Sequence, residues 1–236
     1  YFEFWNLVFI QFHQEGSTYT PLEKKSIDTG MGLERVAALM QGKTTIFDVD
    51  NFRPILDTVG EIAGVRYGEN AGNDVSLRVI ADHLRAVTFL IGDGVLPSNE
   101  GRGYVLRRLI RRAIRHGRLL GITQSFSTQV VAEVVEQMKQ AYPELVEGQK
   151  HIFSIVDLEE KRFAETLEQG MRLLQELMND AKESNVTQIA GQDAFLLYDT
   201  FGFPIDLTRE ILVDAGFTVD EEGFRVAMEA QRERAR

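Results

Sequence analysis

Residues 26–35 read Ser-Ile-Asp-Thr-Gly-Met-Gly-Leu-Glu-Arg, a stretch in which a strand ends and a helix begins. Side chains alternate between the faces of a strand, so we expect Asp28 and Gly30 on the same face. The two glycines allow the backbone to approach a ligand closely. Arg35 falls in the first helical turn, where a positive charge opposes the helix dipole and indicates an anionic partner. Spacing alone leaves two partners open, a ligand or a nearby acid.

Upstream, residues 1–12 (YFEFWNLVFIQF) are rich in aromatic and β-branched side chains and contain no Gly or Pro, which predicts a strand. Its even positions are apolar except Asn6, whose buried amide would need a partner in a neighbouring loop or in a ligand. Glu3 is at an odd position and is therefore expected on the opposite face of the strand. A strand this apolar needs neighbours on both sides, so we expect the chain to be a segment of a longer protein, cut inside a sheet. The turn and strands expected to follow are residues 14–17, 18–22 and 25–29.

Almost everything beyond residue 31 has helical periodicity. We therefore predict a mainly α chain with a small antiparallel β portion, an α+β fold, divided into residues 1–45 and an all-helical part at 46–236. The expected helices are residues 32–41, 51–64, 76–91, 103–117, 126–140, 148–182, 191–198, 207–215 and 220–234.

The 236 residues are 44% hydrophobic and 26% charged and include no cysteine. This composition is typical of a globular protein and excludes collagen-like and disordered classes. The lack of cysteine excludes a disulfide framework and a thiolate zinc site. No apolar run approaches the roughly 18 residues of a membrane-spanning helix, so we expect a cytoplasmic protein with no membrane partner.

Charge is unevenly distributed along the chain. The net charge is −10, and residues 119–236 hold 22 Asp and Glu against 11 Lys and Arg. Residues 102–118, in contrast, hold seven arginines and no acid. Like charges three or four residues apart repel on a helix, so this face indicates an external anion, for which nucleic acid is the simplest candidate. The alternative is that these arginines pair with the acidic second half of the chain.

Four strings in this sequence resemble the alanyl-tRNA synthetases, a family of class II aminoacyl-tRNA synthetases, over nearly the whole chain. The resemblance implies that residues 1–45 are the C-terminal part of an aminoacylation domain, a remnant of its sheet with motif 3, and that residues 46–236 are a helical tRNA-recognition domain. Motifs 1 and 2 would lie outside this chain. The four strings are Glu3-Phe-Trp-Asn6, Asp28-Thr-Gly-Met-Gly-Leu-Glu-Arg35, Arg78-Val-Ile-Ala-Asp-His-Leu-Arg85 with Pro97-Ser-Asn-Glu-Gly-Arg-Gly-Tyr-Val-Leu-Arg-Arg108, and Tyr198-Asp-Thr-Phe-Gly-Phe-Pro204.

The resemblance also implies roles in the activation of alanine. The longer enzyme would use ATP with Mg²⁺ to form alanyl-adenylate and pass alanine to the 3′ end of tRNA(Ala). Arg35 and Asp28 are the expected catalytic residues, the first at the ATP γ-phosphate and the second at the alanine ammonium group. The alanine-binding residues would be Asn6, Val8, Asp28 and Gly30, and the ATP- and magnesium-binding residues Glu3, Gly32 and Arg35. Zinc is expected only in the family's editing domain, outside this chain.

For the RNA, the resemblance implies that Asn99 and Asp199 read a G·U wobble pair in the acceptor stem of tRNA(Ala). The arginine-rich helix would contribute further contacts to the tRNA. Its expected contact residues are Arg102, Arg107, Arg108, Arg111, Arg112 and Arg115.

Two functions remain open at this point. The chain is either a segment of the ligase that is not catalytically competent alone, or a non-catalytic helical module that binds RNA or another partner and retains motif 3 as a scaffold. The simultaneous presence of Asp28 and Arg35 favours the ligase, because a scaffold would need neither charge.

Overall fold

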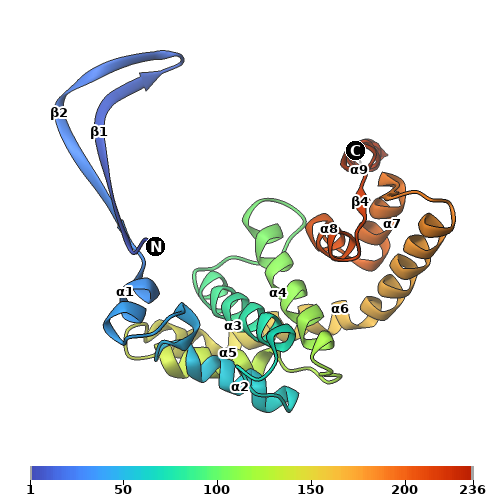
Figure 1. Ribbon diagram of the computed structural model, residues 1–236, viewed down its shortest axis with the longest axis horizontal. Helices are drawn as coiled ribbons and strands as arrows, with labels where there is room; N and C mark the ends of the chain where they lie inside the picture. The colour runs from blue at the N-terminus through green and yellow to red at the C-terminus, as the bar shows by residue number, and fades with distance from the viewer. Residues whose placement is uncertain (1, 235–236) are drawn as a thin grey trace. The chain divides into compact units, whose positions relative to one another are not determined.

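The computed structural model describes residues 2–234 and divides the chain into two compact units that meet in sequence between Pro54 and Ile55. Helices dominate both the sequence and the ribbon (Figure 1). The strands are two pairs, one antiparallel and one parallel, within the described residues. The prediction of a mainly α chain with a small antiparallel β portion is confirmed.

The first unit contains a long hairpin of β1 (Trp5–Glu15) and β2 (Thr18–Met31). Gly16 makes the turn at a φ of 61°, a left-handed conformation that glycine adopts without steric cost. The strand expected from residue 1 begins at Trp5, so the parity argument does not apply to Glu3. The two strands expected at 18–22 and 25–29 are halves of one strand. The sequence suggests a break between them because a run of polar residues lies there. In the structure the strand continues through this run, and only the pairing with β1 shifts its register, between Ile10 and Phe12.

Two short helical elements follow the hairpin. The helix α1 (Leu33–Met40) starts after Gly32, which has an extended backbone, so strand and helix join where the sequence predicts. The 3₁₀ helix η1 (Ile46–Asp48) is not predicted by the sequence. It begins at Thr45, whose side chain accepts a hydrogen bond from the Phe47 N–H, a local cap that produces no hydrophobic period.

The remaining predicted helices are all present, with ends that differ by a few residues. The largest shifts at helix starts come from local capping and proline. Asn70 caps the second of them by accepting from the Gly72 and Asn73 N–H groups, and Pro143 precedes the longest. The helices are α2 (Arg53–Ala63), α3 (Ala71–Gly92), α4 (Gly101–Leu119), α5 (Ser127–Met138), α6 (Glu144–Glu183), α7 (Gly191–Phe201), α8 (Ile205–Asp214) and α9 (Glu221–Arg234).

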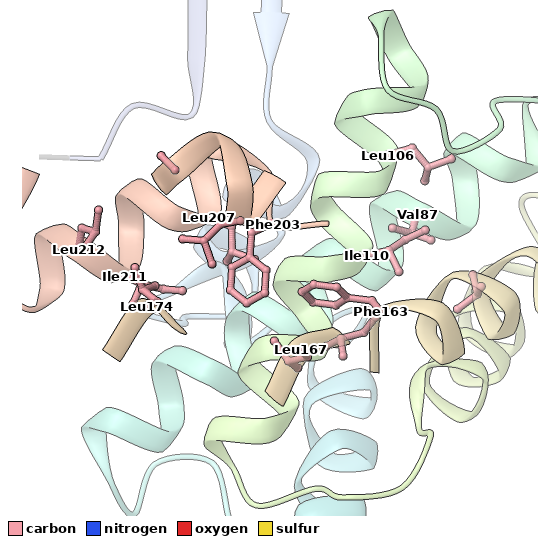
Figure 2. Packing of buried hydrophobic residues seen from close by; sticks show 14 of the residues in the cluster. Val87, Leu106, Ile110, Phe163, Leu167, Leu174, Phe203, Leu207, Ile211 and Leu212 are labelled. Atoms are coloured by element: carbon pink, nitrogen blue, oxygen red, sulfur yellow. The ribbon is translucent and has the colours of Figure 1, made fainter. Parts of the chain in front are cut away.

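The core of the second unit gathers side chains from α3, α4, α6 and α8 (Figure 2). At its centre the ring of Phe163 on α6 meets the ring of Phe203, from the turn after α7, edge to face at 5.6 Å. Gly170, two turns after Phe163, makes room for this ring, because a Cβ there would lie 2.3 Å from Phe203 Cε2. This contact fixes the α7–α8 turn against the middle of α6.

A two-residue parallel ladder joins β3 (Gln188–Ile189) to β4 (Thr218–Val219). Such short strands carry no sequence pattern, and the sequence does not predict them. They bring the starts of α7 and α9 together, and Gly191 permits the contact, since a Cβ there would lie 2.1 Å from the Phe224 nitrogen. As a result α9 packs along α7.

Candidate functional site

The hairpin places four of the expected site residues on one face. Asn6 lies directly opposite Gly30, and Val8 lies directly opposite Asp28. Residues directly opposite in an antiparallel pair project to the same side, so the four form one patch. A Cβ on Gly30 would stand 3.3 Å from Asn6 Oδ1, so glycine leaves space beside the asparagine amide. Strand alternation in the sequence predicts that Asp28 and Gly30 share a face, as Asn6 and Val8 do, and the register of the hairpin brings the two pairs together.

Arg35 crosses from the start of α1 to the start of the hairpin. Its Nη1 donates to the Glu3 backbone oxygen at 2.8 Å, and the guanidinium lies 6.0 Å from the Phe2 ring centre. A Cβ on Gly32 would stand 3.1 Å from Arg35 Cδ, so this glycine makes room for the arginine stem. Within residues 2–234, no carboxylate forms an ion pair with Arg35. The spacing in the sequence allows two partners for Arg35, a ligand or a nearby acid. No such acid is found among the described residues.

The arginines of α4 do not form the unpaired face that the sequence suggests. Five of the seven pair with acids of α6 and α8, which is the alternative that the charge distribution leaves open. These arginines are paired because they are partly or wholly buried, and an arginine that packs inside a bundle requires a countercharge. The pairs are Arg107 and Arg111 with Glu159, Arg108 with Asp206, Arg112 with Glu210, and Arg115 with Glu210 and Asp214.

Glu159 on α6 is the most buried acid in this network, with 4% of its side chain exposed. Its Oε1 accepts from Arg111 Nε at 2.9 Å and lies 3.1 Å from Arg107 Nε. Burial lowers the pKa of the Arg111 guanidinium, and the charge of Glu159 opposes that shift. Arg111 also donates to the Gly202 backbone oxygen and lies 5.1 Å from the Phe163 ring centre. It thus links α4 to α6 and to the end of α7.

A second network centres on Glu210 of α8. Its carboxylate lies 2.6 Å from Arg112 Nε, 3.3 Å from Arg115 Nη1 and 3.4 Å from His116 Nε2. Burial alone would raise the pKa of this carboxyl, but the contacts with His116 and Arg112 and the charges of both arginines outweigh it and lower the pKa to about 2. Glu210 therefore stays ionised and holds α8 to α4.

Arg108 is more accessible than its neighbours. Its Nη1 donates at 2.8 Å to Asp206, which also accepts at 3.2 Å from the Tyr104 hydroxyl. Burial, followed by the charge of Asp206, raises the pKa of Tyr104 to about 12. Arg102, in the first turn of α4, is exposed and forms no ion pair within the described part of the chain.

Asn99 and Asp199, which are 100 residues apart, line one pocket of about 230 Å³. Asn99, in the loop before α4, accepts through Oδ1 from Arg107 Nη1. Asp199, on α7, accepts through Oδ1 from Gln231 Nε2 on α9. The structure thus brings together both residues to which the resemblance assigns the wobble pair. The pocket is lined by Asn99, Tyr104, Arg107, Arg111, Tyr198, Asp199, Gly202, Pro204 and Gln231.

Sequence reasoning misses two residues of this site, Glu159 and Gln231. Glu159 lies among many acids of α6, and nothing in the sequence marks it as a buried acid that meets Arg107 and Arg111. Gln231 lies in a polar stretch at the end of α9, where periodicity indicates only a solvated helix. Only the packing of α6 and α9 against α4 and α7 reveals either role.

A sequence model of the family described as tRNA synthetases class II (A) matches residues 1–236, the entire chain. The chain belongs to this synthetase family. It is 57% identical to an alanine–tRNA ligase of Thermoanaerobacter sp. (strain X514), 55% to one of Clostridioides difficile (strain 630) and 54% to one of Geobacillus kaustophilus (strain HTA426). Each alignment covers 100% of this chain and 27% of the relative, so the chain spans about a quarter of the length of these ligases.

Membership of the class II synthetases implies ATP and Mg²⁺. In residues 2–234, no group of three or more His, Asp or Glu side chains is placed to hold a metal ion. Magnesium that accompanies a nucleotide is typically held by only one or two carboxylates, because the phosphate oxygens of the nucleotide supply other ligands. A site for such an ion therefore does not need a cluster of three acids. None of the helices in the described residues is long and apolar enough to cross a membrane.

Proposed function

We propose that this chain is a segment of an alanine–tRNA ligase that reads the acceptor stem of tRNA(Ala) with its helical part. In this proposal residues 1–45 belong to the aminoacylation domain and residues 46–236 recognise tRNA. The observation that carries the proposal is the meeting of Asn99 and Asp199 in one pocket beside Arg107 and Arg111. Arginines supply charge for the RNA backbone, and an amide with a carboxylate supplies a donor and an acceptor for base edges.

Hydrogen-bond chemistry supports an orientation for the Asn99 side chain. Arginine has no acceptor, so Arg107 must meet the oxygen of the Asn99 amide, which leaves the amide NH₂ for the ligand. The ionised Asp199 can only accept. The Asn99 and Asp199 side chains therefore offer one donor and one acceptor to a base pair. The minor groove of a base pair with guanine presents the matching set, the guanine N2 amine and the pyrimidine O2, and this groove is wide and shallow in RNA.

On the hairpin, Asp28 would bind the ammonium group of alanine, while Asn6, Val8 and Gly30 would surround its methyl group. The proximity of these four residues on one face supports the assignment. Arg35, which lacks a carboxylate partner among the described residues, would bind the γ-phosphate of ATP, with Gly32 beside it. When the alanine carboxylate attacks the α-phosphorus and pyrophosphate departs with its electrons, a fixed guanidinium stabilises the charge of the leaving group.

Glu3 would supply a carboxylate to the magnesium ion that accompanies ATP. Its backbone oxygen already contacts Arg35, so its side chain lies at the same end of the hairpin as the proposed phosphate site. When bound, the ion neutralises phosphate charge. The zinc site of the family's editing domain is expected elsewhere in the longer protein.

The chain alone is proposed to be inactive in aminoacylation, because its described residues supply one hairpin and motif 3 rather than a complete ATP site. Alanine-dependent pyrophosphate exchange by the 236-residue chain should stay at background. Exchange well above that of an Asp28→Ala variant would contradict this part of the proposal.

The RNA proposal is tested by binding of a short acceptor-stem hairpin, carrying either the G·U pair or a Watson–Crick pair, at several salt concentrations. We expect preference for the wobble stem and a salt dependence equivalent to a few phosphates. Arg102→Ala should weaken binding to both stems equally and reduce the salt slope by about one. Salt-dependent binding without preference would refute the roles of Asn99 and Asp199. Absence of binding would assign the arginines of α4 to the fold alone.

A further inference from the structure

The end of α9 contacts both sides of the proposed wobble-pair pocket through consecutive residues. Gln231 Nε2 donates to Asp199 Oδ1 on α7. Arg232 Nη2 donates to Glu100 Oε1 at 3.0 Å, and Glu100 directly follows Asn99. One turn of α9 thus touches one proposed base reader and the residue next to the other.

This approach is fixed by packing further up the helix. Asp220 accepts from the Gly223 N–H at 2.9 Å, and the Phe224 nitrogen lies against Gly191 at the start of α7. The Phe224 ring meets the Tyr198 ring edge to face at 5.7 Å. Gln231 lies seven residues after Phe224, on the same helix face, so it reaches the residue that follows Tyr198.

The chemistry of the contact suits a carboxylate that must remain available to a ligand. A glutamine amide donates without neutralising the charge, and it occupies Oδ1 of Asp199, while Oδ2 accepts no hydrogen bond from residues 2–234. Arg107 does the corresponding work for Asn99 by fixing its amide oxygen. Each reader therefore has a partner that orients it.

We propose that Gln231 is a positioning residue for base discrimination, which holds Asp199 so that its second oxygen meets the guanine amine of the wobble pair. The proposal rests on the proposed RNA function of the pocket. Arg232 with Glu100 acts as a tether between α9 and the Asn99 loop. In this role Gln231 acts on base discrimination through its hydrogen bond to Asp199.

The test compares the hairpin preference, the ratio of dissociation constants for the Watson–Crick and wobble stems, in four forms of the 236-residue chain. These are the unmodified chain, Asp199→Ala, Gln231→Ala and the matched control Gln137→Ala. Gln137 is also an exposed glutamine whose amide donates to a carboxylate, that of Glu133 on α5 at 2.6 Å, but it lies outside the pocket. Thermal unfolding of each variant checks that the fold is intact.

Gln231→Ala should reduce the preference roughly 3-fold to 10-fold, the loss expected for one orienting hydrogen bond. Its melting temperature and its salt slope should not change, and Gln137→Ala should match the unmodified chain. Equal preference in Gln231→Ala and the unmodified chain, with preference lost in Asp199→Ala, would overturn the positioning role alone. A stronger preference would also overturn it, since Gln231 would then be a competitor of the base. No preference in the unmodified chain would overturn the RNA function as well.

The isosteric variant Gln231→Glu distinguishes a positioning role from a purely structural one. Only a positioning role predicts that the hairpin preference of this variant depends on pH. Two facing carboxylates raise the pKa of one of them, and once protonated that group donates as the amide did. The preference of this variant should therefore recover as the pH falls from about 8 to about 5. The other charged groups around the pocket are Arg107 and Arg111 on α4, Glu100 before it and Arg232 on α9. A preference that stays constant with pH would refute the hydrogen bond as its source.

Discussion

The Glu210 carboxylate on α8 lies 2.6 Å from Arg112 Nε on α4, although 98 residues separate the two in sequence. The arginine helix is therefore held inside the fold by acids from the second half of the chain. Arg107 is both part of this interior network, through Glu159, and a partner of Asn99 in the pocket. The helix α4 therefore contributes both to the stability of the fold and to the proposed recognition site. Substitutions can test these two contributions separately.

Stability should fall in acid through Glu210. The pKa of this carboxyl is lowered from 4.5 to about 2 in the folded chain, so its contribution is present above pH 4.5 and is lost as the pH falls towards 2. Partial exposure screens the effect, which should amount to roughly 1–2 kcal/mol. Urea unfolding of Glu210→Gln between pH 7 and pH 2.5 should show a shallower acid loss than the unmodified chain.

A matched control is Glu222→Gln, which removes the exposed partner of Arg225. Its pH profile should superimpose on that of the unmodified chain. If Glu210→Gln has the same acid profile as this control, the low pKa is not a source of stability.

Truncation of Arg111 should destabilise the fold much more than truncation of Arg108. Arg111→Ala leaves the buried Glu159 with Arg107 alone and removes a cation–π contact, a loss of about 2–4 kcal/mol. Arg108→Ala leaves Asp206 with Arg209 and should cost less than about 1 kcal/mol, because this pair is partly exposed. Urea unfolding measures both, and equal losses would contradict the assignment of Glu159 as the central acid.

Asn99→Asp should abolish base discrimination without affecting stability. The new carboxylate still accepts from Arg107 but has no NH₂ to donate to the base. The preference for the wobble stem should fall about 10-fold, the value of one good base contact, with the salt slope unchanged. Competition binding with the two stems measures this ratio. Retained preference would show that Asn99 presents its oxygen rather than its nitrogen to the base.

Two glycines of α6 should respond in opposite ways to alanine. A Cβ at Gly170 would lie 2.3 Å from the Phe203 ring, so Gly170→Ala should cost roughly 1–3 kcal/mol. A Cβ at Gly148 would lie 4.0 Å from the nearest side-chain atom, Ile152 Cδ1, so Gly148→Ala should stabilise the chain by about 0.4–1 kcal/mol. Thermal unfolding of both variants provides the comparison, and destabilisation by both would mean that helix propensity is not the deciding factor at Gly148.

Periodicity in the sequence carries most of the fold. The 3.6-residue pattern predicts every α-helix of the described residues, and strand alternation pairs Asn6 with Val8 on one strand and Asp28 with Gly30 on the other. These patterns are local, because each reflects which side of one element is apolar or meets a partner.

At the candidate site, the failures of prediction are matters of pairing over distance. The sequence shows an excess of acids after residue 118 but does not say that Glu159 and Glu210 are the ones that meet the arginines of α4. Gln231 is also invisible, because its role depends on how α9 packs on α7. The resemblance to a family names Asn99, Asp199 and Arg107, yet it does not name Gln231, which donates to Asp199.

The middle of α6 determines the spacing between the two proposed readers. Glu159 holds α4, and with it the side of the pocket that carries Arg107 and Asn99, while Thr166 donates to the Phe201 backbone oxygen at 2.8 Å and holds the end of α7, two residues after Asp199. These two anchors lie seven residues apart on one helix, a rise of about 10 Å. If the pocket binds a base pair as proposed, this short span of α6 helps to set the distance between Asn99 and Asp199, so a residue outside the pocket can affect recognition.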